Sequence, residues 1–242
     1  MRNRTELQTG VTERGKAGTL ILSGGGNGEQ SRIINVYFAE LINKEKPVLY
    51  IPLAGDPHVR PYKESFEYVG QMFHEAGIKK VVMWTEVSLK TRQDLEAFSA
   101  IYISGGDSGR LLNIVKEDGF DEVLIDYFQN GGIIYGQSAG AIIFAKELTH
   151  LKNGHPVAGL NLIEGCSIWC HYTQKDDEAI HKRVTQLRHS VLLLPEGNAV
   201  LWNGSHMRSM GARSSFLINE WLEKEPVEEL DDEALHSKSN SG

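Results

Sequence analysis

The stretch IIYGQSAGAI, residues 133–142, places one hydroxyl between two glycines at the point where an apolar run ends. Gly136, Ser138 and Gly140 form the pattern G-x-S-x-G, in which a serine occupies a sharp turn between a strand and a helix. The glycines remove Cβ atoms that would collide in such a turn. The flanking residues predict a buried strand before Ser138 and a helix over residues 139–146 after it. We therefore expect a fixed, exposed hydroxyl beside backbone N–H donors, as in the nucleophile elbow of a serine hydrolase.

Similar apolar runs precede this turn. Each is almost continuous in apolar residues, as expected for strands buried on both faces, and the runs cover residues 19–23, 47–53, 80–84, 100–104 and 132–136. Segments between them have helical periodicity, as in Phe66, Val69 and Phe73. This alternation predicts an α/β fold with a doubly wound, mostly parallel sheet and helices on both faces. After residue 145, short strands separated by turns predict an antiparallel edge.

Length and charge predict one folded domain with two extensions. We expect a flexible N-terminal arm over 1–18, a single α/β domain over 19–222 and a flexible acidic tail over 223–242. The tail has seven acidic residues and two lysines, and so carries −5 of the net charge of −7. Its composition is poor in apolar residues and has no aromatic residue, which is typical of segments that do not fold alone.

Composition also bears on partners and location. No apolar run approaches the roughly 18 residues of a membrane span, and residues 1–18 lack the apolar core of a secretory signal. The body has no basic stripe for a nucleic acid. We therefore expect a cytoplasmic protein with neither a membrane nor a nucleic-acid partner, and the sequence leaves open whether it forms a homo-oligomer.

The two cysteines do not indicate a metal site. Cys166 and Cys170 form a single C-x3-C pair, which supplies too few ligands for structural zinc. We expect two reduced, buried thiols. Nothing in the sequence implies a metal or an organic cofactor.

Two further glycine-rich turns follow predicted strands. SGGGNGE (23–29) matches neither the dinucleotide fingerprint nor the phosphate loop, so we interpret it as a tight turn near a site or simply as a turn. SGGD (104–107) could bring bare backbone N–H groups to an anion, or could simply turn the chain into the next helix. Both lie at the carboxyl ends of strands, where open α/β sheets place their ligands.

A serine nucleophile needs a base within hydrogen-bonding reach. Of nine histidines, His171 is the strongest candidate, because it ends the apolar run SIWC and precedes a polar segment. That position places it on the same rim as Ser138. His58 and His155 lie in predicted loops and remain alternatives.

At these residues the chain resembles the serine peptidases that include dipeptidase E and cyanophycinase. The resemblance covers residues 19–217 and rests on four stretches in order: YISGGDSGRLL, GGIIYGQSAGAI, GLNLIEGCSIWCHYT and LLLPEGNAV. It implies a fold similar to class I glutamine amidotransferases. It also implies Ser138 as nucleophile, His171 as base, and an oxyanion hole formed by the N–H groups of Gly106 and Ala139.

The resemblance further implies a small or specialised peptide substrate with an aspartyl group beside the scissile bond. A carboxylate needs cations or N–H donors around it. The candidates for substrate binding are Asp107 in SGGD and three arginines near predicted loops or the strand bearing His171, namely Arg60, Arg110 and Arg183.

One departure from the family pattern concerns the acid that orients the base. The family places it some 15 to 18 residues after the serine, where this chain has KNGHPV. Glu147 and Glu164 are the only carboxylates between Ser138 and His171, and Asn153 is a polar alternative. Loss of such an acid costs about 10⁴ in turnover. A non-catalytic small-molecule-binding domain therefore remains a competing hypothesis, and an esterase or acyltransferase is another.

Overall fold

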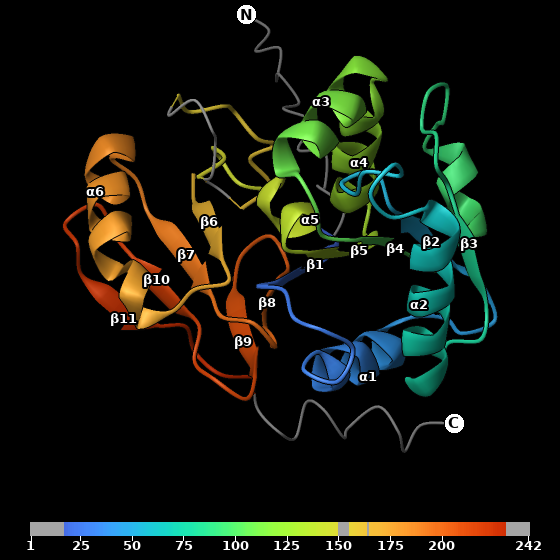
Figure 1. Cartoon of the computed structure of the whole chain (residues 1–242), viewed down its shortest axis with the longest axis horizontal. Helices are drawn as coiled ribbons and strands as arrows, with labels where there is room; N and C mark the ends of the chain where they lie inside the picture. The colour runs from blue at the N-terminus through green and yellow to red at the C-terminus, as the bar shows by residue number, and fades with distance from the viewer. Residues whose placement is uncertain (1–16, 150–154, 164, 231–242) are drawn as a thin grey trace, which may run out of the picture.

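The computed structural model of the chain describes residues 17–149, 155–163 and 165–230. Strands and helices alternate through the first half, and short strands dominate the second (Figure 1). In chain order the elements are β1 (Thr19–Ser23), α1 (Arg32–Leu41), β2 (Val48–Ile51), α2 (Tyr62–Glu75), β3 (Val81–Met83), η1 (Gln93–Ala97), β4 (Ala100–Ile103), α3 (Ser108–Glu117), α4 (Phe120–Gln129), β5 (Ile133–Gln137), α5 (Ala139–Ile142), β6 (Ser167–Cys170), η2 (Gln174–Asp176), α6 (Asp177–Leu187), β7 (Val191–Leu194), β8 (Asn198–Trp202), β9 (Met207–Gly211), β10 (Phe216–Ile218) and β11 (Lys224–Pro226).

The larger sheet has seven strands in the order β3-β2-β4-β5-β1-β8-β9. The first five are parallel, and β8 and β9 add an antiparallel edge. Helices α1 and α2 cover one face, while α3, α4 and α5 cover the other (Figure 1). The predicted fold class is therefore confirmed. The inner strands β1, β2, β4 and β5 are largely buried because both faces are covered by apolar helix surfaces.

A second sheet was not predicted. It has four strands in the order β11-β10-β7-β6, with α6 packed against it through Ile180 and Val184. Strands β6 and β7 pair in parallel, with Cys170 opposite Leu194. Parallel strands end at the same sheet edge, so the chain segments that follow β6 and β7 emerge side by side.

The boundary expected after residue 222 lies too early. Residues 224–226 form β11 against β10, and Val227 is buried. The Ser209 N–H donates to the Glu228 carbonyl at 2.7 Å, and the Leu230 N–H donates to the Ser209 carbonyl at 2.8 Å. Composition could not predict this strand pairing, because it uses backbone N–H and carbonyl groups, which acidic residues have as well as apolar ones. Residues 1–16 of the predicted arm and 231–242 of the predicted tail lie outside the described residues.

The helix after Ser138 is shorter than expected. Helix α5 covers only Ala139–Ile142, and the next carbonyls are bonded elsewhere. The Leu160, Asn161 and Leu162 N–H groups donate to the carbonyls of residues 143, 145 and 144. A helix could continue only if these carbonyls accepted from residues 147–149. Long-range pairing therefore replaces the helical bonds that local periodicity predicted.

None of the helices in the described ranges combines the length and the hydropathy that a bilayer-spanning segment requires.

Two truncations test the contribution of β11. A chain that ends after residue 222 should melt about 3 to 12 °C below one that ends after residue 230. Burying one valine contributes about 1.5–3 kcal/mol, and each kcal/mol shifts the melting temperature by about 2–4 °C at this size. The measurement is thermal unfolding by circular dichroism. Equal melting temperatures would contradict a structural role for residues 223–230.

Candidate active site

Ser138 occupies a sharp turn between β5 and α5, as the sequence predicted. Its backbone angles are φ 49° and ψ −109°, a conformation that costs a non-glycine residue about 1–3 kcal/mol. The surrounding backbone holds it there. The Ser138 N–H donates to the Ser23 carbonyl at 2.9 Å, and the Ser138 carbonyl accepts from Ala141 and Ile142, each at 2.9 Å.

The two glycines of the motif permit close backbone approach. A Cβ on Gly136 would lie 2.3 Å from the Gly140 carbonyl oxygen, and a Cβ on Gly140 would lie 2.2 Å from the Ile103 carbonyl oxygen. Neither neighbour is a flexible side chain that could move aside. The turn therefore requires glycine at both positions, and this requirement explains the spacing in the sequence.

His171 follows β6 and reaches the serine. Its Nε2 lies 2.8 Å from Ser138 Oγ. The His171 backbone N–H donates to the Gly24 carbonyl at 3.0 Å, which joins the second sheet to the carboxyl end of β1. His58 and His155 are both exposed, and neither hydrogen-bonds to Ser138 in the described ranges. Of the histidines in the described ranges, His171 is the one that hydrogen-bonds to Ser138.

A carboxylate lies on the other side of the imidazole. Glu196 Oε1 is 2.9 Å from His171 Nδ1. Because a carboxylate accepts hydrogen bonds, Nδ1 carries the proton, and Nε2 is left to accept the hydrogen of the Ser138 hydroxyl. Both side chains are about half exposed, at 51% and 46%. Serine, imidazole and carboxylate thus form a continuous chain of hydrogen bonds.

Glu196 was not among the predicted acids. Glu147 uses its carbonyl oxygen to accept from Ser167 Oγ and pairs with Ala158, and its side chain makes no contact with His171. Glu164 and Asn153 lie outside the described residues. A signal for Glu196 was present, because it follows the apolar run LLLP just as His171 follows SIWC. Recognising it required knowing that β6 and β7 are parallel neighbours.

The SGGD loop lies opposite the elbow. A Cβ on Gly105 would lie 3.3 Å from Ser138 Cβ. Gly106 has φ 149°, and a Cβ there would lie 2.2 Å from the Ala54 carbonyl oxygen, so the loop requires glycine at this position. Within the described part of the chain, the N–H groups of Gly106 and Ala139 donate to no other group. Both N–H groups are therefore candidates for binding a ligand.

The glycine-rich turn after β1 packs against the imidazole. A Cβ on Gly25 would lie 2.4 Å from His171 Cε1, so any side chain there would displace the ring. The Gly26 carbonyl accepts from Gln137 Nε2 at 2.8 Å, and Gln137 Oε1 accepts from Tyr102 Oη at 2.7 Å. Burial raises the pKa of Tyr102 well above its ordinary value, so its hydroxyl keeps the proton that it donates. Of the two interpretations of this segment, a turn near the candidate site fits these contacts better than a turn alone.

A cavity of about 370 Å³ opens beside the elbow, lined by polar groups from Gly105, Gln137, Tyr50, Ser104 and Arg60. Of the three predicted arginines, Arg60 is the one that lines it. Its guanidinium lies over the Tyr68 ring, 5.5 Å from the centroid.

The other substrate-binding candidates are engaged elsewhere. Arg110 Nε donates to the Leu53 carbonyl, and Arg183 donates to the Leu148 carbonyl and to Gln186. The Asp107 carboxylate accepts from the Arg110 N–H and so caps α3.

Cys170 lies directly behind the serine, with Sγ 3.7 Å from the Ser138 carbonyl oxygen. Both cysteines are free and buried. Burial raises the pKa of the Cys170 thiol well above its ordinary range and that of Cys166 to about 12. A buried neutral thiol is a poor nucleophile, so Cys170 is not a candidate for the reactive group at this turn.

Comparison with known proteins shows similarity to peptidases. The uncharacterized peptidase YgaJ of Bacillus subtilis is 27% identical over 166 residues, which cover 63% of this chain and 67% of that protein. A shorter match, 34% identical over 76 residues, is to the pyridoxal 5'-phosphate synthase subunit PdxT of Fervidobacterium nodosum, and covers 31% of this chain and 38% of that subunit. The chain thus spans well under half of the PdxT relative.

The fold has a solved counterpart. The crystal structure of a peptidase from an acI-B1 actinobacterium superposes with a TM-score of 0.62 at 18% identity, and covers 90% of this chain and 97% of that one. The model of peptidase family S51 matches residues 19–210. This match covers the strand-and-turn framework that carries Ser138, His171 and Glu196, and the chain belongs to peptidase family S51.

Proposed function

We propose that the protein is a serine peptidase in which Ser138 is the nucleophile, His171 the general base and Glu196 the acid that orients it. The observation that carries this proposal is the pair of hydrogen bonds, 2.8 and 2.9 Å long, that joins the three side chains at a strained elbow. This is the geometry that a Ser-His-acid triad requires.

The mechanism follows from the positions of the protons. His171 Nε2 takes the proton of Ser138 Oγ while Oγ attacks the carbonyl carbon of the scissile bond. The negative charge then on the substrate oxygen is stabilised by the free N–H groups of Gly106 and Ala139. The imidazolium, held by Glu196, gives its proton to the leaving amine, and the C–N bond breaks. Water repeats the sequence on the acyl-enzyme and releases the acid product.

The two alternatives from the sequence have less support. A non-catalytic binding domain was motivated by the absence of an orienting acid, and Glu196 removes that motive. An esterase or acyltransferase would use the same elbow. Membership of peptidase family S51 favours the peptide bond.

We further propose that the substrate is a small peptide with an aspartyl group beside the scissile bond. The cavity of about 370 Å³ next to the elbow accommodates a few residues at most. Arg60 supplies a cation at its rim, and the hydroxyls of Tyr50 and Ser104 supply further polar groups. A carboxylate side chain is the partner that such a lining favours.

The first prediction for this proposal concerns the nucleophile. Ser138→Ala should abolish hydrolysis and leave the melting temperature unchanged, because alanine preserves the space at the turn and removes only Oγ. The measurement is hydrolysis of a dipeptide panel by the purified protein. Substantial activity in a folded Ser138→Ala variant would show that Ser138 is not the nucleophile.

The second concerns Glu196. Glu196→Gln should lower kcat by up to about 10⁴, because the amide can donate to Nδ1 and so leaves the proton on Nε2, where it blocks transfer from the serine. Glu147→Gln is the matched control and should retain wild-type kcat. A large loss of kcat in Glu147→Gln together with wild-type kcat in Glu196→Gln would instead assign the orienting role to Glu147.

The third concerns specificity. Arg60→Ala should lower kcat/KM for Asp-Leu about tenfold and leave Leu-Leu nearly unchanged, because one charged hydrogen bond is lost. Arg183→Ala is the control, since its guanidinium donates to the Leu148 carbonyl and to Gln186 and does not line the cavity. A wild-type enzyme that prefers Leu-Leu, or an unchanged ratio in Arg60→Ala, would exclude the aspartyl proposal and leave the peptidase proposal standing.

A further inference from the structure

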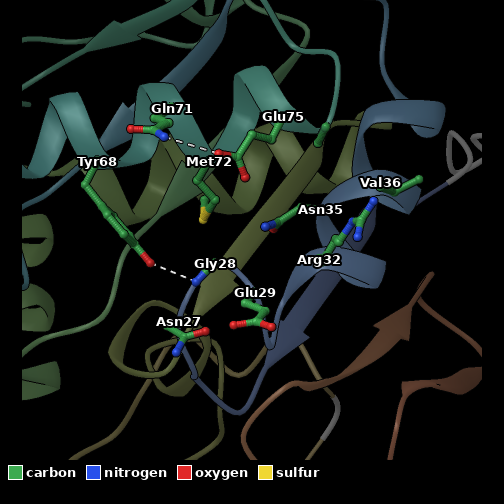
Figure 2. A pocket seen from close by; sticks show the side chains of 11 residues that line it. Asn27, Gly28, Glu29, Arg32, Asn35, Val36, Tyr68, Gln71, Met72 and Glu75 are labelled. Carbon is green, nitrogen blue, oxygen red and sulfur yellow. Dashed lines mark hydrogen bonds between the residues drawn. The ribbon is translucent and has the colours of Figure 1, made fainter.

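A second cavity adjoins the one beside the elbow, and Tyr68 lines both. It has a volume of about 680 Å³ and opens between α1 and α2, and the turn that contains Asn27 and Gly28 borders it (Figure 2). The Gly28 N–H donates to Tyr68 Oη at 2.8 Å. Asn27 and Tyr68 line both this cavity and the smaller one beside the elbow. The larger cavity contains none of the residues assigned to catalysis.

Asn35 places a free donor at the base of this cavity. The residue is only 2% exposed. Its Oδ1 accepts from Tyr135 Oη at 3.2 Å, which fixes the orientation of the amide. Figure 2 shows the amide nitrogen pointing into the cavity, and no group in the described ranges accepts from it. The nitrogen faces the cavity with no acceptor from the described part of the chain, and a ligand that supplies one there would gain a hydrogen bond whose direction the Tyr135 contact already fixes.

Three charged side chains surround the opening. Arg32 and Glu29 lie on one side and Glu75 on the other (Figure 2). All three are exposed, and none is among the ion pairs formed within the described part of the chain. Val36 and Met72 supply an apolar wall between them. The cavity therefore offers two carboxylates, one guanidinium, one fixed amide donor and an apolar surface.

We propose that this cavity is a binding site for a free basic amino acid of the lysine type. Such a ligand carries one carboxylate and two ammonium groups, which complement the single cation and the two anions of the cavity. Its α-carboxylate would lie between Arg32 and the Asn35 amide, and its α-ammonium against Glu29. Its methylene chain would pack on Met72 and Val36, and its terminal ammonium would reach Glu75. Charge-assisted hydrogen bonds at both ends give the specificity.

The site is separate from the proposed chemistry but adjacent to it. Its Asn27 belongs to the same glycine-rich turn as Gly25, which packs on the His171 ring, and Gly26, which accepts from Gln137. Tyr68 carries Arg60 on its ring face. The proposal needs no catalytic activity, so it stands or fails independently of the peptidase assignment.

Calorimetric titration of the full chain with L-lysine tests the proposal. L-Lysine should bind at one molecule per chain. L-Norleucine, which lacks the terminal ammonium, and cadaverine, which lacks the carboxylate, should each bind at least about tenfold more weakly, because each loses a charged hydrogen bond. Equal binding of either control, or no binding of lysine, would overturn the proposal.

Variants then locate the site. Arg32→Gln and Glu75→Gln should each weaken lysine binding about tenfold, and both residues are exposed, so folding is not at risk. Asn35→Asp keeps an acceptor for Tyr135 and removes the free donor, and should weaken binding as well. Glu64→Gln, an exposed acid on α2 that does not line the cavity, is the matched control and should bind as wild type does. Wild-type affinity in both surface variants would place lysine elsewhere and refute the assignment.

Discussion

The strained backbone at Ser138 is the constraint on which the site depends. A serine with φ 49° persists only where its surroundings fix it, and here both sides of the residue are bonded: its N–H to the end of β1 and its carbonyl to the first turn of α5. The bare backbone of Gly136 and Gly140 allows β4, β5 and α5 to approach closely enough for this. The parallel sheet thus stabilises a turn that a short peptide would not adopt. The hydroxyl is fixed in direction before any substrate arrives.

The proposed triad depends equally on how the two sheets meet. Ser138 comes from the seven-stranded sheet, whereas His171 and Glu196 follow neighbouring strands of the four-stranded one. The hydrogen bond from the His171 N–H to the Gly24 carbonyl and the contact of Gly25 with the imidazole hold these two parts in register. Since the imidazole is about half exposed, its position rests on these backbone contacts and on Glu196 more than on burial.

Local patterns predicted what depends on local residues. The strands of the larger sheet, the turn at Ser138 and the rim position of His171 follow from apolar runs and from glycines at fixed spacing, and these the sequence displays directly. Glu196 could not be found this way, because its contact with His171 spans 25 residues and arises from the parallel pairing of β6 with β7. The family pattern directed attention to the segment after Ser138, where this chain has no acid. The shortness of α5 also results from long-range contacts. The N–H groups of residues 160–162 donate to the carbonyls that a longer helix would have used. Where the side chains of Arg110 and Arg183 point depends on the carbonyls that lie near them in the fold. The sequence does not show which carbonyls these are.

The central claim is that Ser138 is activated by His171. The most direct measurement is mass spectrometry of the protein after reaction with a fluorophosphonate, which labels activated serines. The account predicts one adduct, located on the peptide that contains Ser138, and a labelling rate at least about a hundredfold lower in His171→Ala, as expected when the general base is lost. No adduct on Ser138 in the folded wild-type protein, or an equal rate in His171→Ala, would contradict it.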